Sequence, residues 1–222
     1  MKRVRWAALA AGSVMLLSGC GSADNNNVWG EYLQILKDSA SGTFGDHAVT
    51  REQAAAVPYA TMGYRLNGGQ EMMIVLATDT NGDLLWTSAA HIVLLTHEGR
   101  IIRTVGLPHN ISGVMPILGD HLPAPASVLR AAFTSTRTVD YPDTGTYSVP
   151  ISCKIMTAGR ETISILGQSI ATVRADESCK SDGWSFQDSY WLDPTSGFVW
   201  RSLQHLTPKG DTIETEILRP PG

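Results

Sequence analysis

Apolar and polar side chains alternate along most of the chain from residue 59 onward. Segments rich in Ile, Val, Thr and aromatic residues are separated by turn residues every eight to twelve positions, a spacing typical of β-sheet proteins. Segment 212–217 alternates in period two, so one face of this strand is predicted to lie on a core and the other in water. The pattern predicts an all-β fold, mainly antiparallel, with coiled or curved sheets.

Glycine-containing turns divide this region into hairpins. Asn81-Gly82 is a pair typical of the type I′ turn that joins two antiparallel strands. Gly99 and Gly68-Gly69 mark two further tight turns. The predicted hairpins pair 72–78 with 84–88 and 91–96 with 100–107.

One or two short helices are predicted before the first strand. Within 28–38, apolar residues recur near helical spacing. Thr50 and Gln53 form a capping-box pattern that opens a helix over 52–56, and Pro58 ends that helix.

The segment 108–125 divides the β-rich region in two. It contains four of the eleven prolines, so it is predicted to be a long connection across the surface. The flanking halves, 59–110 and 134–220, contain similar blocks: Leu85-Trp86 followed by Ile102-Arg103-Thr104, and Tyr190-Trp191 followed by Trp200-Arg201-Ser202. This likeness predicts a weak internal repeat. Chance similarity between hairpins rich in turn residues explains it nearly as well.

The first 20 residues have the order of a bacterial lipoprotein signal. Basic residues within 1–5 precede an uncharged apolar run over 6–17, which is too short for a membrane helix of about 20 residues. Leu17-Ser18-Gly19-Cys20 matches the lipobox, in which the Cys20 thiol takes the lipid. An ordinary signal peptide that contains a cysteine is the alternative. The predicted divisions are a signal peptide over 1–19, a lipidated tether over 20–27 and one β-rich periplasmic domain over 28–222.

The residues after the lipobox predict the membrane to which the lipoprotein is sorted. A mature lipoprotein carries enough acyl chains for stable anchoring. Gly21 and Ser22 follow Cys20, and no aspartate comes directly after it. By analogy with enterobacterial sorting rules, we predict the outer membrane, with the domain facing the periplasm.

Charge and cysteine content narrow the functional classes. Removing residues 1–19 leaves 203 residues with 14 Lys and Arg against 21 Asp and Glu, a net charge of −7. Nucleic acid is therefore not a predicted partner, because phosphate binding requires a basic surface. Cys153 and Cys179 remain in an oxidising compartment, which predicts a disulfide. Two unpaired buried thiols are the alternative.

Motifs for catalysis or metal binding are weak. One continuous strand would place His91 and His97 on the same face, but no HExxH run or paired-cysteine zinc spacing accompanies them. Ser169 lies in the nearest match to a hydrolase nucleophile motif, yet its context is strand followed by strand. No carboxylate pair stands out. We predict no catalytic residues, no metal and no cofactor.

Aromatic and basic side chains supply a candidate binding surface. Aromatic residues crowd 184–200, where flat rings could stack on sugar faces, although core packing explains them as well. Arginines could meet an anionic glycan, but a solvated strand edge also explains them. The candidate residues for this surface are Trp86, Arg100, Arg103, Trp191 and Arg201.

Several blocks occur in order along the mature chain: Val57-Pro58-Tyr59-Ala60-Thr61-Met62, Arg65-Leu66-Asn67-Gly68-Gly69, Leu85-Trp86-Thr87-Ser88, Gly99-Arg100-Ile101, Tyr190-Trp191-Leu192-Asp193 and Val199-Trp200-Arg201-Ser202. With the lipobox and the two later cysteines, they resemble the YjbF/GfcB family of outer-membrane lipoproteins. The resemblance implies an all-β periplasmic fold, operons that encode an outer-membrane β-barrel protein and other periplasmic factors, and a part in exopolysaccharide or capsule production. It transfers no catalytic residues.

The leading hypothesis is a non-enzymatic accessory in exopolysaccharide or capsule assembly or export. The membrane, the outer-membrane β-barrel protein, periplasmic export factors and the polysaccharide itself are its expected partners. Two alternatives stay open. A glycan-modifying enzyme predicts a pocket with two carboxylates whose pKa values are pushed apart, and a lipid or glycan carrier predicts a deep apolar cavity rather than a filled core.

Overall fold

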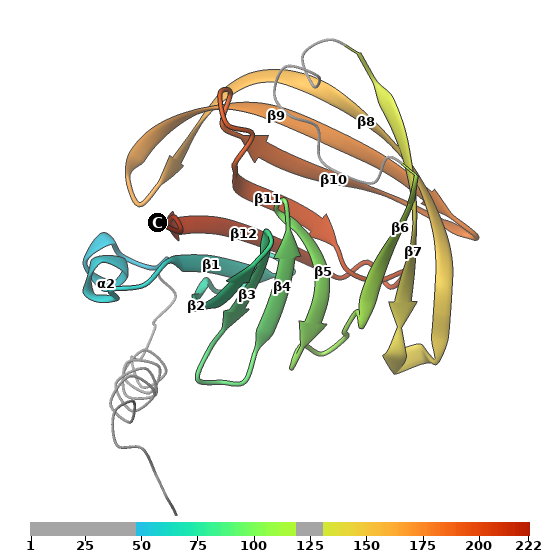
Figure 1. Ribbon diagram of the computed structural model, residues 1–222, viewed down its shortest axis with the longest axis horizontal. Coiled ribbons are helices and arrows are strands. Elements are labelled where there is room, and N and C mark those ends of the chain that lie inside the picture. Colours follow the sequence, from blue (N-terminus) through green and yellow to red (C-terminus); the bar gives the residue numbers. More distant parts are fainter. Residues whose placement is uncertain (1–47, 119–130) are drawn as a thin grey trace, which may run out of the picture.

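Twelve antiparallel strands form one sheet in the computed structural model, which describes residues 48–118 and 131–222 (Figure 1). Helix α2 (Arg51–Ala56) precedes the first strand, and the 3-10 turn η1 (Pro142–Thr144) joins β7 to β8. The prediction of an all-β, mainly antiparallel fold is confirmed. The strands are β1 Thr61–Leu66, β2 Met72–Thr80, β3 Asp83–Thr87, β4 Val93–His97, β5 Arg100–Val105, β6 Gly113–Leu118, β7 Phe133–Tyr141, β8 Thr146–Ile165, β9 Gln168–Ser181, β10 Trp184–Leu192, β11 Val199–His205 and β12 Thr212–Arg219.

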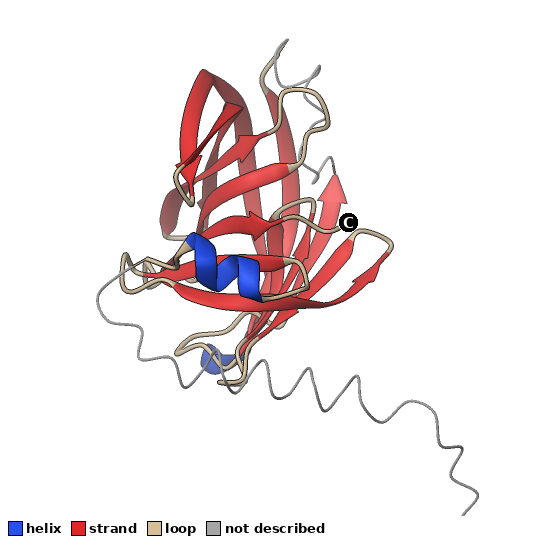
Figure 2. Ribbon diagram, turned by 90° about the vertical axis from the view of Figure 1, so that its left-hand side faces the viewer, coloured by secondary structure: helices blue, strands red, loops and turns tan. Residues whose placement is uncertain are grey.

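The strand order is β5-β4-β3-β2-β1-β12-β11-β10-β9-β8-β7-β6. Neighbours in the sheet are therefore neighbours in the chain, except that β1 pairs with β12, with Tyr64 opposite Thr215. The sheet coils until its edge strands approach each other (Figure 1, Figure 2). Between these edges, the Thr104 amide donates to the Ile111 carbonyl at 2.9 Å. The sheet is nearly closed, with one inner and one outer face.

The predicted hairpins are present, with small differences at the strand ends. Asn81 and Gly82 join β2 to β3 with φ values of 55° and 86°, and Glu98 and Gly99 join β4 to β5 with 49° and 80°. Type I′ turns require positive φ at both central residues, which explains why these sequences fold back tightly here.

The predicted capping box opens helix α2. The Gln53 amide donates to Thr50 Oγ1 at 3.2 Å, and the Thr50 amide donates to Gln53 Oε1 at 2.8 Å. Arg51 donates to the Leu166 carbonyl at 2.6 Å. The helix is thereby tied to the tip of the long β8–β9 hairpin.

The main hydrophobic core lies on the inner face of the sheet. Trp86 is completely buried there, and Tyr190 is completely buried in a second, smaller cluster. Full burial of such large side chains contributes strongly to stability. The main cluster consists of Met62, Tyr64, Ile74, Trp86, Leu94, Ile101, Leu107, Ile111, Val139, Tyr141, Ile151, Cys153, Cys179, Leu206, Ile213 and Ile217.

One sequence prediction is wrong, and one condition considered in the sequence is not met. The segment 108–125 is not one long connection, because it contains β6, which pairs with β7. Pro116 fits in this strand because β6 is at the edge of the sheet, where one side needs no hydrogen-bond donor. His91 and His97 do not share a strand, since His91 has a φ of 61° before β4 begins.

The two similar sequence blocks occupy different strand arrangements. β4 lies between β3 and β5, whereas β10 and β11 pair directly. The predicted signal peptide, Cys20, the tether and the helix over 28–38 fall outside the described residues. Within the described part of the chain, no helix is long and apolar enough to cross a membrane.

Candidate functional site

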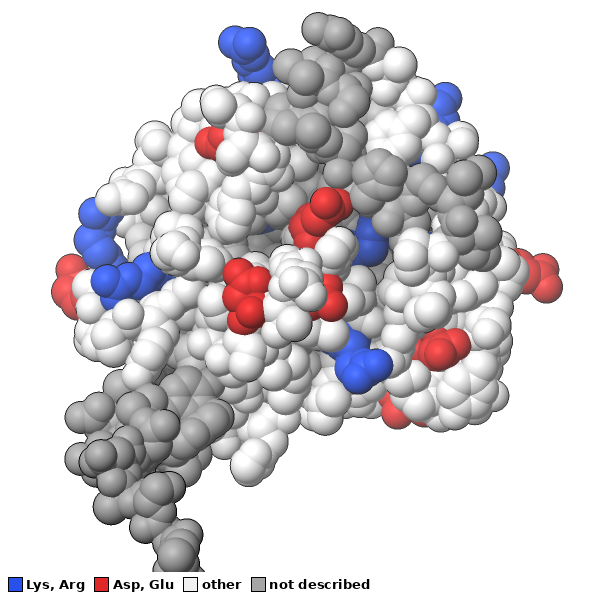
Figure 3. All heavy atoms as spheres, viewed as in Figure 1, with Lys and Arg blue, Asp and Glu red and all other residues white. Residues whose placement is uncertain are grey.

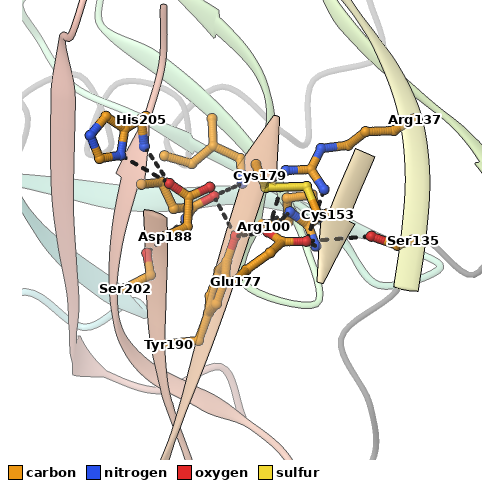
Figure 4. A network of polar contacts seen from close by, with 12 residues as sticks. Arg100, Ser135, Arg137, Cys153, Glu177, Cys179, Asp188, Tyr190, Ser202 and His205 are labelled. Carbon is orange, nitrogen blue, oxygen red and sulfur yellow. Dashed lines mark hydrogen bonds and ion pairs between the residues drawn. A yellow bond between two sulfur atoms is a disulfide. The ribbon is translucent and has the colours of Figure 1, made fainter. Parts of the chain in front are cut away.

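A network of charged side chains lies inside the coiled sheet (Figure 4). Alternation along β9 places Glu177 on the inner face, in step with the buried Val173 and Ala175. Arg100 of β5 binds the Glu177 carboxylate at 2.7 and 3.1 Å, and Arg137 of β7 binds it at 2.9 and 3.3 Å. All three charged residues are buried. The double ion pair also joins β5, β7 and β9, which are distant in the sequence.

Hydroxyl groups and a second carboxylate extend the network. The Tyr190 hydroxyl accepts from Arg100 at 3.2 Å and donates to Glu177 at 3.4 Å. Asp188 of β10 accepts from the backbone amide of His205 at 2.8 Å and contacts its ring nitrogen at 3.2 Å. The network therefore has a partner for each buried charge, which is the usual condition for burying one.

Glu177 and Asp188 have pKa values shifted in opposite directions. Burial favours a higher pKa for Glu177, but Arg100 and Arg137 outweigh it and lower the pKa to about 2. Burial raises the pKa of Asp188 above its ordinary value, against the hydrogen bonds from His205. Such a pair is the pattern expected of acid–base catalysis. The adjoining cavity, however, has a volume of about 30 Å³, which suits a water molecule and is far too small for a sugar.

The predicted disulfide between Cys153 and Cys179 is confirmed. The two cysteines are direct register partners on β8 and β9. Both sulfurs and a Glu177 carboxylate oxygen lie within 4.8 Å of one another, an arrangement that resembles a metal site. The sulfurs are bonded to each other and two arginines bind Glu177, so this cluster is a structural centre.

A much larger cavity opens at the end of the sheet where β2, β4, β10 and β12 finish. We call it the end pocket, and its volume is about 770 Å³. Phe198 and Trp200 form part of its wall, with ring centroids 5.0 Å apart and ring planes at 80°. Its lining residues are Met62, Asp79, Gly82, Leu84, Trp86, Thr96, Glu98, Gly99, Asp193, Ser196, Gly197, Phe198, Val199, Trp200, Thr215, Ile217, Pro220 and Pro221.

Three carboxylates from separate hairpins line the end pocket, namely those of Asp79, Glu98 and Asp193. Among the described lining residues, none is Lys, Arg or His. Figure 3 shows acidic side chains near the centre of one face, over the tips of the β2–β3 and β4–β5 hairpins. Asp193 accepts the backbone amides of Ser196 and Thr195 at 2.7 and 2.9 Å. The Ser196 amide above all lowers the pKa of Asp193, which keeps this carboxylate charged.

The Gln204 side chain holds the β4–β5 turn against β11 beside the pocket. Gln204 donates from Nε2 to the Gly99 carbonyl at 2.9 Å and accepts the Ile101 amide at 3.0 Å. A Cβ atom on Gly99 would lie 2.5 Å from that of Val199. Only glycine permits this close approach, so Gly99 determines where Glu98 is placed.

The five residues predicted to form one binding surface do not lie together. Trp86 is buried on the inner face of β3 and donates from Nε1 to Thr96 at 3.0 Å. Arg100 is buried in the Glu177 network. Neither side chain is on the outer surface, because the coiled sheet encloses the face to which both point, so the surface prediction is wrong for Arg100. Trp86 lines the end pocket from inside the sheet. Arg103 is exposed on β5 and donates to the Ser112 carbonyl at 2.9 Å.

Trp191 and Arg201 do lie together, directly opposite each other on β10 and β11. The guanidinium groups of Arg174 and Arg201 are 5.5 and 5.7 Å from the centre of the Trp191 ring, within cation–π distance. Arg201 also pairs with Glu216 at 2.5 Å. This outer-face cluster is separate from the end pocket, since none of its members lines that cavity.

Comparison with known proteins identifies the family. A family model described as "Group 4 capsule polysaccharide lipoprotein gfcB, YjbF" matches residues 38–218. The chain belongs to the YjbF family. Its relatives include "Uncharacterized lipoprotein GfcB" of Escherichia coli (strain K12), 30% identical, with 93% of this chain and 94% of the relative covered. "Uncharacterized lipoprotein YjbF" of the same organism is 26% identical, with 92% and 93% covered.

A solved structure supports the fold of this YjbF-family protein. The crystal structure of the hypothetical lipoprotein YmcC from Escherichia coli (K12) matches with a TM-score of 0.70 and 25% identity, over 90% of this chain and 99% of that one. The resemblance found in the sequence is confirmed. This YjbF-family protein is a lipoprotein and thus a membrane-anchored protein of the cell envelope. None of the names of these relatives is that of an enzyme.

Sequence reasoning did not find the end pocket of this YjbF-family protein. Part of the signal is present, because Asp79 stands three residues before Gly82 and Glu98 directly before Gly99, the glycines of two predicted hairpin turns. Asp193 follows the strand that contains Trp191. The order of strands in the coiled sheet is needed to see that these three hairpin ends meet.

Proposed function

We propose that this chain is an outer-membrane lipoprotein that acts, without catalysis, in the assembly or export of a capsule or exopolysaccharide. Cys20 anchors it and the β-rich domain faces the periplasm. The observation that carries the proposal is the match of residues 38–218 to a family described as group 4 capsule polysaccharide lipoproteins. The lipobox before Cys20 and the absence of an aspartate directly after it support the location.

The interior of the protein supports a role without catalysis. Glu177 and Asp188 have the divergent pKa values of an acid–base pair, but the cavity beside them holds about 30 Å³. Glu177 is completely buried and bound by two arginines. A substrate therefore has no access to this pair, and the charges serve to hold β5, β7 and β9 together.

An accessory of this kind works through partners. We propose that the protein docks to an outer-membrane β-barrel protein and to periplasmic export factors, which the membrane anchor keeps within reach. The Trp191 cluster on the outer face, with Arg174 and Arg201, is a suitable contact surface because tryptophan and arginine are enriched at interfaces.

Deleting the gene and restoring variants tests the proposal. We expect the deletion strain to lose most of its surface polysaccharide, and wild-type protein to restore it. The matched control for anchoring is the same mature chain with Cys20→Ala behind an ordinary cleavable signal peptide, which delivers an unacylated form to the periplasm. We expect this form to restore little polysaccharide, because it is not held beside its membrane partners.

The same strains distinguish an accessory from an enzyme. An accessory changes the amount of surface polysaccharide and leaves its sugar composition and linkages unchanged, whereas loss of a modifying enzyme changes the linkages. Linkage analysis of residual polymer from the deletion strain therefore decides between them. Normal export in the deletion strain would contradict the proposed function, and normal export from the unanchored form would contradict the role of the anchor.

A further inference from the structure

The end pocket combines a size, a shape and a charge that point to one class of ligand. Its volume of about 770 Å³ falls within the range of about 300–1,000 Å³ that is usual for ligand sites. Both Phe198 and Trp200 are only partly buried in its wall. With ring planes at 80°, they form an aromatic corner whose flat surfaces suit the C–H faces of a sugar ring.

We infer that the end pocket binds a neutral segment of a polysaccharide, which stacks on Phe198 and Trp200 while its hydroxyl groups donate to the carboxylates around it. The inference rests on the proposed function, which supplies the polysaccharide. The acceptors are Asp79, Glu98 and Asp193, which come from three separate hairpins and surround the cavity. Hydrogen bonds to charged acceptors are stronger than neutral ones, so hydroxyl-rich ligands are favoured.

Charge excludes acidic sugars from this site. The described lining residues include three carboxylates and no Lys, Arg or His. An anionic sugar would be repelled by these carboxylates, and would find no cation to compensate for the loss of its hydration. Arg100, which follows Gly99 in the chain, is bound to Glu177, and Arg219, which precedes Pro220, donates to the Val57 carbonyl. Neither arginine lines the end pocket.

The same carboxylates argue against an acyl chain. A fatty chain seated in the cavity offers no hydrogen-bond donors and would remove water from the charged groups around it, which is costly. Two of these groups are also fixed in place before any ligand arrives. Asp79 accepts the Gly82 amide at 3.3 Å, and Asp193 accepts the amides of its own turn. Such pre-organisation reduces the entropy lost on binding.

Tryptophan fluorescence of the purified protein tests the inference. The protein is the full mature chain, secreted in unacylated form with Cys20→Ala so that no detergent enters the pocket. The probes are oligosaccharides released from the producing strain's own surface polysaccharide, separated by anion exchange into neutral and acidic fractions, with palmitate as the rival ligand. We expect the neutral fraction to bind and change the fluorescence, and the other two probes to leave it unchanged.

Variants then locate the site. Trp200→Ala should weaken binding about tenfold through loss of stacking, and Asp193→Asn and Glu98→Gln should each weaken it about three- to tenfold. The aromatic control is Trp184→Ala, at the opposite end of β10, where Trp184 stacks on Phe186. The carboxylate control is Asp140→Asn. The native Asp140 carboxylate accepts the Ser148 amide of β8 and does not line the end pocket. Both controls should bind like the parent protein. Calorimetric titration supplies the affinity for variants that lack a tryptophan signal.

The outcomes separate this inference from the proposed function. Preference for the acidic fraction or for palmitate overturns the inference, as does the absence of any binding. Neutral-sugar binding that survives both Trp200→Ala and the exposed Glu98→Gln variant also overturns it, since Glu98→Gln leaves the core untouched. If no oligosaccharide binds but the deletion strain still loses export, the proposed function stands without this site. If binding is as expected but the deletion strain exports normally, the proposed function fails instead.

Discussion

At the scale of single residues, Glu177 is the group on which the interior depends most. Replacing it with Gln leaves Arg100 and Arg137 buried without a counter-charge, so we expect Glu177→Gln to lower the free energy of unfolding by about 3–5 kcal/mol. Its pKa is lowered from 4.5 to about 2, so its stabilising effect is present above about pH 4.5 and is lost as the pH falls toward 2.

Urea unfolding of the unacylated mature chain, followed between pH 7 and pH 2, measures both effects. The parent protein should lose stability across this window more steeply than Glu177→Gln. The control is Glu161→Gln, which removes an exposed partner of Arg174 at 4.0 Å and should cost less than about 1 kcal/mol. Equal unfolding midpoints for the parent and Glu177→Gln at pH 7 would show that the ion network contributes nothing.

Residue identity alone indicates part of this site. Val173, Ala175 and Cys179 are apolar at every second position of β9, so the inward direction of Glu177 can be read from the sequence. Its partners cannot, because Arg100 is 77 residues away and Arg137 is 40 residues away. The same limit explains the error for Trp86 and Arg100, whose side of the sheet is decided by long-range strand pairing.

At the scale of elements, the contact between the β4–β5 turn and β11 is the most constrained. At residue 99 the backbone φ is +80°, and the Cβ atom added by Gly99→Ala would lie 2.5 Å from Val199. We expect a loss of about 2–4 kcal/mol, from positive φ and from overpacking. The control is Gly183→Ala in the β9–β10 turn, where φ is +78° and no atom lies within 4 Å. We expect Gly183→Ala to lower the free energy of unfolding by only about 1 kcal/mol, from the positive φ alone. Urea midpoints of the two variants should differ, and equal values would contradict the close contact.

Elements with strong local signals are predictable from the sequence, and the others are not. Asn81-Gly82 and the Thr50–Gln53 capping box contain their own turn and cap chemistry, so the hairpin and helix α2 follow from a few adjacent residues. β6 is different. Its Pro116 and the surrounding prolines indicate a loop, and only pairing with β7 makes the segment a strand.

At the scale of the whole molecule, the first and last strands, β1 and β12, lie in the middle of the sheet rather than at its edges. β12 pairs with β1 on one side and with β11 on the other. This closure is beyond sequence patterns, because alternation in 212–217 identifies a strand with a buried face but not its two neighbours. It also means that a few residues at the C-terminus decide whether the sheet is continuous.

Two truncations test this arrangement. Ending the chain at Asp211 removes β12, so β1 and β11 each lose one of their two partners and the sheet is open in its middle. We therefore expect no folded protein, as judged by circular dichroism and resistance to protease. Ending it at Arg219 removes only Pro220, Pro221 and Gly222, which follow the last strand. The free energy of unfolding of this shorter chain should stay within about 0.5 kcal/mol of that of the parent, as for surface changes that remove no core contact. Since Pro220 and Pro221 line the end pocket, the shorter truncation should weaken ligand binding while the fold is retained. A folded chain that ends at Asp211 would mean that β1 and β11 pair without β12, and that the sheet order is different in solution.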